Sequence, residues 1–143
     1  MLLSKACVYA IRAALLVASR DDPRERKFIP VREIAEDLGL SFHFLTKVLQ
    51  SLTEVGIMES FRGPRGGVGL ARPAGKITLY DIVAAVDGRE AFESCVLGLP
   101  KCSGKAPCPM HTEWAKTRSR LVRMFERQTV ASLSRNLTEF HLK

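Results

Sequence analysis

The stretch that decides the fold is residues 31–71, which read VREIAEDLGLSFHFLTKVLQSLTEVGIMESFRGPRGGVGLA. Apolar residues recur at helical spacing over residues 31–38 and again over residues 44–52. Gly39 lies between these two predicted helices and permits a tight turn, and Ser41 is placed where it can cap the second helix. Two helices joined by a short glycine-containing turn form a helix-turn-helix, so the spacing predicts that motif.

A glycine-rich and arginine-rich turn follows the predicted helix pair. Residues 57–61 and 68–71 flank the sequence Arg62-Gly63-Pro64-Arg65-Gly66-Gly67, whose glycine and proline content predicts a hairpin loop. Two arginines in a short loop suit a narrow minor groove, and glycines let the backbone approach a phosphate strand. A helix-turn-helix followed by such a hairpin is a winged helix. From the residues alone, an ordinary helical hairpin and an exposed turn with incidental charge stay open as alternatives.

The candidate DNA contacts come from these two elements. The second helix would present five polar side chains that can reach base edges or phosphates in a major groove, namely Ser41, His43, Thr46, Lys47 and Gln50. The turn adds Arg62, Gly63, Arg65 and Gly66. The chain has 22 Lys and Arg against 15 Asp and Glu, and this net charge of +7 favours a polyanionic partner.

Helical patterns also flank this unit. One extends from Ser4, a plausible N-cap, to about Arg20, and a second follows Thr78 as far as residue 86. Residues 87–109 have no convincing period and predict a long loop, which is usually functional or disordered. Residues 111–137 predict one long helix. The chain should therefore be mainly α-helical, with the hairpin as a small β wing.

The long loop contains the pattern Cys95-x6-Cys102-x5-Cys108-x2-His111. Three thiolates and an imidazole are soft or borderline ligands, suited to an iron–sulfur cluster or to zinc. Cys108 and His111 are about one helical turn apart and can face one point. The spacing does not choose between the metals, and a redox-active disulfide pair without metal is a third interpretation. Cys7, on an apolar helix face, is interpreted as a buried small hydrophobe.

Composition excludes several classes of protein. With 46% hydrophobic and 26% charged residues, the 143-residue chain resembles an ordinary globular protein. No stretch approaches the roughly 20 apolar residues of a membrane span, and the apolar run at residues 13–18 is too short for a signal peptide, so we expect a cytoplasmic protein. The sequence contains no nucleotide-binding loop and no paired catalytic carboxylates, so we expect no enzyme activity. An iron–sulfur redox protein without DNA binding is the rival from another class.

These motifs resemble a family of winged-helix transcription regulators that includes the iron–sulfur cluster regulator IscR and the nitric-oxide sensor NsrR. The resemblance covers nearly the whole chain. It rests on Leu3-Ser4-Lys5 with Tyr9-Ala10, on Ile34-Ala35, on residues 45–52, on the turn at residues 62–67, on Ile82-Val83 with Val86-Asp87-Gly88, and on the cysteine loop.

The resemblance implies a homodimeric repressor that senses redox state. Residues 1–75 would form the DNA-binding domain, and residues 76–143 a dimerisation region with a metal-binding loop at about residues 88–111 and a long C-terminal dimerisation helix. Each subunit would bind one half of a palindromic operator.

The resemblance also implies a ligand set. Relatives of the IscR type bind a 2Fe–2S cluster through three cysteines and a histidine placed like His111, whereas those of the NsrR type bind a 4Fe–4S cluster with a carboxylate from the partner's first helix. Here that position is Val8, which cannot bind metal, so the resemblance favours Cys95, Cys102, Cys108 and His111 with a 2Fe–2S cluster. A 4Fe–4S cluster, or zinc, is the alternative, and Cys7 leaves a thiolate from the partner open.

Overall fold

The chain is mainly helical, and its described part contains one two-stranded antiparallel sheet. The computed structural model describes residues 3–22, 24–25, 27–137 and 142. In chain order the elements are α1 (Lys5–Ser19), α2 (Val31–Leu38), α3 (Phe42–Glu54), β1 (Met58–Phe61), β2 (Gly67–Leu70), the 3-10 turn η1 (Ala74–Lys76), α4 (Leu79–Val86), α5 (Glu90–Glu93), α6 (His111–Arg127) and α7 (Val130–Ser134). The predicted fold class, mainly α with a small β wing, is confirmed.

The helix-turn-helix forms where the sequence predicts it. Helix α2 ends at Gly39, whose φ of 65° is in the left-handed region that glycine adopts without steric cost. Ser41 then caps α3, because its hydroxyl oxygen accepts a hydrogen bond of 3.2 Å from the Phe44 amide. The predicted apolar faces of the two helices meet in the core, where Ile34 and Leu45 are fully buried.

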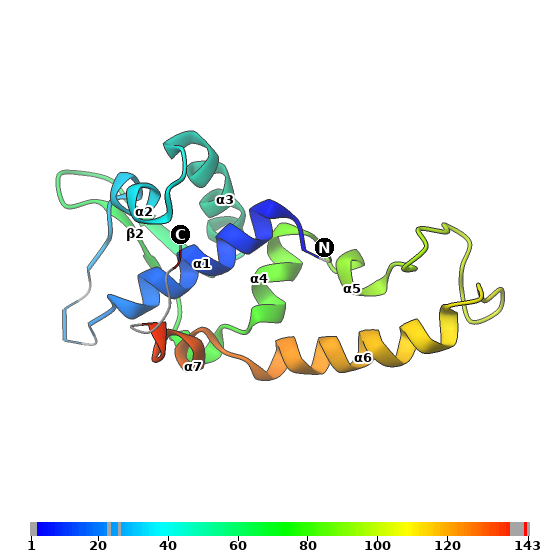
Figure 1. The fold of residues 1–143 in the computed structure, drawn as a ribbon. Helices are drawn as coiled ribbons and strands as arrows, with labels where there is room; N and C mark the ends of the chain where they lie inside the picture. The colour runs from blue at the N-terminus through cyan, green and yellow to red at the C-terminus, as the bar shows by residue number, and fades with distance from the viewer. Residues whose placement is uncertain (1–2, 23, 26, 138–141, 143) are drawn as a thin grey trace.

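Helix α1 lies at the centre of the molecule. Its N-cap is Ser4, as predicted, with the hydroxyl oxygen accepting from the Cys7 amide at 3.0 Å. Its buried face consists mainly of alanines, and Ala10, Ala13 and Ala14 are fully inaccessible to solvent. Short side chains let neighbouring helices approach closely, and α1 packs against α2, α3, α4, α7 and β2. Figure 1 shows α1 running across the middle of the fold.

The wing is attached to the chain segment before α2. Strands β1 and β2 pair with Phe61 opposite Gly67, and Ile29 adds a bridge to Val68 through two hydrogen bonds of 2.9 Å each. A Cβ at Gly67 would lie 2.1 Å from the Ile29 carbonyl oxygen, and one at Gly66 would lie 2.3 Å from the Phe61 carbonyl oxygen. Gly66 is therefore required by a contact within the wing, and Gly67 by the contact between the wing and the segment before α2.

The prediction of one long helix over residues 111–137 is wrong. Helix α6 ends at Arg127, Gln128 is extended, and α7 starts after Thr129, whose side chain caps it. The break is stabilised by the beginning of α4, because the Leu79 amide donates to the Gln128 carbonyl at 2.9 Å. The Val130 amide likewise donates to the Ile77 carbonyl at 2.9 Å, and Val130 is fully buried. These contacts turn α7 back under α1 (Figure 1).

Helix α6 and the loop before it extend away from the helix-turn-helix (Figure 1). The segment predicted to be irregular contains the short helix α5 and otherwise consists of turns and bends. Of the helices in the described part of the chain, none is long and apolar enough to cross a membrane.

We expect Gly67→Ala to destabilise the chain by about 1–3 kcal/mol, because the added methyl group requires a backbone shift at the Ile29 bridge. Urea denaturation monitored by circular dichroism measures the change. Gly104→Ala is the control, because a Cβ there meets nothing within 4 Å. Equal stabilities of the two variants would contradict this account of the wing.

Candidate functional site

The three loop cysteines converge at the start of α6. The sulfur atoms of Cys95, Cys102 and Cys108 all lie within 4.8 Å of one another, and those of Cys95 and Cys108 are 3.5 Å apart. His111 joins them, because its Nδ1 lies 3.3 Å from the Cys102 sulfur. The structure therefore brings together all four residues that the sequence singles out as candidate ligands.

Two side chains from α6 attach the loop to the helix. Trp114 donates from Nε1 to the carbonyl of Ser94 at 2.8 Å, and Arg118 donates to the carbonyl of Glu93, also at 2.8 Å. These bonds fix the backbone directly before Cys95. At the other end of the loop, His111 is the first residue of α6, and its amide donates to the Cys108 carbonyl at 3.0 Å. The cysteine cluster is thus positioned by both ends of the loop and by α6.

The cysteines of the cluster differ in acidity. Main-chain N–H groups, first that of Leu99 and then that of Leu97, lower the pKa of Cys95 to about 7 against the desolvation that would raise it. The pKa of Cys108 is raised, first by desolvation and then by its hydrogen bonds with the neighbouring thiols of Cys102 and Cys95. Of these two cysteines, Cys95 is therefore the one that forms a thiolate more readily in the metal-free chain.

The donor set fits a metal centre. Zinc–thiolate bonds of about 2.3 Å in a tetrahedron place two sulfurs about 3.8 Å apart, which is close to the separations in this cluster. Thiolates with one imidazole nitrogen are also ligands of iron–sulfur clusters. The three cysteines, with His111 beside them, could hold either group without any large rearrangement of the backbone.

Cys7 lies outside this cluster. It is fully buried on α1, where it packs with Val83 and Phe92. Desolvation, with a smaller contribution from the carboxylate of Asp87, raises the pKa of Cys7 to about 12. The prediction of a buried small hydrophobe is confirmed. Asp87 also accepts hydrogen bonds from the main-chain amide and the hydroxyl of Ser4, so the N-cap of α1 is joined to the residue that follows α4.

The candidate DNA contacts on α3 and the wing are solvent-accessible. All five predicted side chains of α3 are exposed, namely Ser41, His43, Thr46, Lys47 and Gln50. In the wing, Arg62, Gly63 and Arg65 are exposed and Gly66 is half-buried. Because β1 packs against α3, the wing adjoins the second helix of the helix-turn-helix.

Sequence reasoning missed three residues of this surface. Phe42, directly after the cap of α3, is 44% exposed, and Phe61 in the wing is 56% exposed. The guanidinium of Arg32 on α2 lies 5.8 Å from the centroid of the Phe42 ring. The apolar period gave no signal for Phe42, because this residue lies three positions before Leu45 and seven before Leu49 and so continues the period into the exposed first turn of α3.

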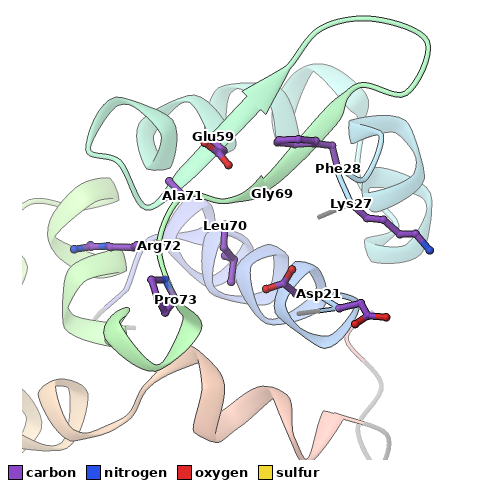
Figure 2. A pocket seen from close by; sticks show the side chains of 10 residues that line it. Asp21, Lys27, Phe28, Glu59, Gly69, Leu70, Ala71, Arg72 and Pro73 are labelled. Carbon is purple, nitrogen blue, oxygen red and sulfur yellow. The ribbon is translucent and has the colours of Figure 1, made fainter. Parts of the chain in front are cut away.

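A hollow of about 320 Å³ lies between the wing and the end of α1. Figure 2 shows Phe28, Glu59 and Arg72 around it, with Asp21 and Lys27 at its edge. Charged side chains of both signs line the hollow, so its chemistry indicates no particular class of ligand. We assign it no role.

Together, the helix-turn-helix and the attached two-stranded wing define a winged-helix protein, and the cysteine cluster could hold a metal. The fold is shared with CymR (YrzC), the global cysteine regulator of Bacillus subtilis, with a TM-score of 0.77 and 22% sequence identity over 93% of this chain and 95% of that one.

Residues 3–136 match the Rrf2 family, described as iron-dependent transcriptional regulators. A protein of Aquifex aeolicus (strain VF5) named as an HTH-type transcriptional regulator is 35% identical over 99% of this chain and 96% of its own length. The HTH-type transcriptional regulator IscR of Photobacterium profundum is 33% identical over 90% of this chain and 72% of its own. The chain belongs to the Rrf2 family. Family membership confirms the predictions of a transcription regulator and of a chain that is not an enzyme.

We expect iodoacetamide at pH 8 to modify Cys95 in the reduced, metal-free native chain and to leave Cys7 unmodified. The thiolate is the reacting species, and a pKa raised from 9.0 to about 12 lowers its fraction at Cys7 about a thousandfold. Peptide mass spectrometry measures the modification at each site. In the guanidinium-unfolded control, Cys7 and Cys95 should react alike; equal rates in the native chain would contradict the prediction.

Proposed function

We propose that this chain is a homodimeric, sequence-specific repressor that binds a palindromic operator in the cytoplasm, and that an iron–sulfur cluster sets its affinity for DNA. The ligands would be Cys95, Cys102, Cys108 and His111. The observation that carries the proposal is the convergence of three sulfurs within 4.8 Å beside an imidazole, in a chain whose other half is a winged helix.

DNA recognition would use both exposed elements of the winged helix. Lys47 and Gln50 lie on the outer face of α3, where they can reach phosphates or base edges in the major groove. Gln50 donates to Glu54 at 3.2 Å in the free protein, so this bond would be exchanged on binding. Arg62 and Arg65 in the wing suit the minor groove, whose negative potential attracts arginine.

The ligand chemistry and the family support an iron–sulfur cluster, and we propose that it is of the 2Fe–2S type. The family is described as iron-dependent, and the relatives named IscR resemble this chain over most of its length. When bound, such a cluster would supply a group that reacts with oxidants and that is lost when iron or sulfide is scarce. The chain's own residues would hold it at the junction between the loop and α6.

The loop is placed where its conformation can affect both halves of the molecule. His111 starts α6, so a displacement of its side chain would alter the first turn of that helix. At the other end, Asp87 is joined to Ser4 at the start of α1, which packs directly on α3. We infer that the ligand state of the four residues biases the orientation of the DNA-binding unit. DNA binding must then change the affinity for the metal group by the same factor.

Helix α6 supports the proposed homodimer. None of its residues, all of them within the described part of the chain, is buried, although the helix carries an apolar seam. The seam follows alternating steps of four and three residues from the N-cap residue Met110 through Trp114, Leu121 and Met124, with the polar Thr117 in one position, and this spacing is typical of paired helices. Met110 and Met124 are 45% and 50% exposed. Pairing with a second α6 would remove this apolar surface from water.

A second candidate is a regulator that uses zinc or thiol oxidation in place of the cluster. The 3.5 Å separation between the sulfurs of Cys95 and Cys108, with a lowered pKa at Cys95, favours this alternative over a purely structural loop. The two candidates use the same residues and differ in their inorganic content, so the amounts of iron and sulfide distinguish them.

We expect the wild-type chain, purified without air, to contain iron and acid-labile sulfide and to absorb visible light, and Cys102→Ala to lose most of both. Removal of one of four ligands leaves an incomplete coordination shell. Cys7→Ala is the matched control and should retain both. The same three proteins are then compared for binding to a duplex enriched from a random library by the wild type.

In that experiment, Cys102→Ala alone should change the affinity for the enriched duplex. Zinc without iron would establish the second candidate. Full iron and sulfide in Cys102→Ala would refute the ligand assignment, and failure to enrich any duplex would refute the DNA-binding function.

We expect Met124→Glu to raise the dimer dissociation constant about tenfold or more, because a carboxylate would have to be desolvated in the helix seam. Sedimentation equilibrium measures the constant. Val55→Glu is the control, because Val55 is a similarly exposed apolar residue (54%) that lies at the end of α3 and outside the α6 seam. Dimers of equal strength in both variants would rule out the α6 seam as the interface.

A further inference from the structure

Phe42 is an unusual residue for its position on the protein surface. It is the first residue of α3 and is 44% exposed, whereas the outward-facing side chains that follow it, such as His43 and Thr46, are polar. Single exposed apolar residues are common and need no explanation by themselves. What distinguishes Phe42 is its place on the helix and the contacts that orient its ring.

The ring is held from two directions. The guanidinium of Arg32 lies 5.8 Å from its centroid, within the range of a cation–π interaction, and the His43 ring meets it edge-on with centroids 5.8 Å apart. Arg32 comes from α2, so the two helices of the helix-turn-helix orient the ring together. An exposed ring that is oriented in advance loses less conformational entropy when it contacts a partner.

The direction of the side chain then limits what it can meet. Side chains of an α-helix lean toward its N-terminus, so the Phe42 ring extends toward the beginning of α3. Residues at the N-terminal end of a recognition helix are the ones that contact base edges. In the major groove the apolar feature of a base edge is the C5-methyl group of thymine, and phenylalanine is among the side chains that contact it.

We propose that Phe42 is a specificity-determining residue that contacts the C5-methyl group of a thymine in each operator half-site, with Arg32 positioning the ring. This inference rests on the proposed DNA-binding function and deepens it. The selectivity is for a methyl group in the major groove, so it is independent of phosphate contacts and of the metal centre.

The test removes the methyl group and nothing else. A duplex enriched by the wild-type chain from a random library is resynthesised with each thymine in turn replaced by deoxyuridine. Replacement of one thymine per half-site should weaken binding of the wild type about fourfold. This is the loss expected when one methyl-sized group is no longer buried in the complex. Phe42→Ala should bind the thymine and uracil duplexes equally, and its dependence on salt should match that of the wild type because no phosphate contact is lost.

Phe61→Ala is the matched control, because it removes a ring of 56% exposure from the wing while leaving α3 intact. It should retain the fourfold difference. If binding of the wild type is insensitive to every uracil replacement, the inference is wrong whatever the variants do. It is also wrong if the Phe42→Ala protein still binds the thymine duplex more tightly than the uracil duplex. If a duplex is enriched in either case, the proposed DNA-binding function survives; if none is enriched, both fail.

Discussion

The close packing around α1 is the constraint on which the rest of the structure depends. Ala10, Ala13 and Ala14 are fully buried, and they let α1 contact α3 on one side and α4 and α7 on another. A larger side chain at any of these positions would separate the helices, because protein interiors have no spare volume. The helix-turn-helix and α4, which precedes the cysteine loop, are therefore packed on the same helix.

Sequence patterns predicted the parts of the fold that local chemistry determines. The turn at Gly39 and the cap at Ser41 follow from residues close to each other in the chain, and the apolar faces of α2 and α3 follow from their period. The end of α6 could not be found in this way. It depends on hydrogen bonds from Leu79 and Val130 to Gln128 and Ile77, and these link segments about fifty residues apart. A helical period continues across such a break because it contains no information about distant partners.

In the candidate site, too, the sequence predicted what depends on local residues and not what depends on distant contacts. The cysteine pattern predicted which residues would gather, since ligand types and spacing belong to the sequence. The hydrogen bonds from Trp114 and Arg118 to the backbone before Cys95 could not be predicted, because they span 20 and 25 residues. Phe42 was missed for a different reason. The DNA contacts predicted from the sequence are polar side chains, whereas the proposed contact of Phe42 rests on the exposure and orientation of its ring, which are properties of the folded chain.

The hydrogen bonds between Ser4 and Asp87 connect the helix that supports the proposed DNA-binding unit to the segment that carries the cysteine loop. Asp87 ends α4 and precedes the cysteine loop, and it accepts hydrogen bonds from the N-cap residue of α1. In the proposed function, a change at the cysteine cluster would reach Asp87 through the backbone of residues 88–94, which is attached to α6 at Ser94 and Glu93. Asp87 is hydrogen-bonded to Ser4, the N-cap residue of α1, and α1 packs on α3. The proposed coupling would therefore run through covalent backbone, hydrogen bonds and packed helices, and it would need only a small reorientation of α1 relative to α6. In a dimer paired through α6, such a reorientation would change the separation between the two α3 helices. That separation must match the distance between the two half-sites of a palindromic operator.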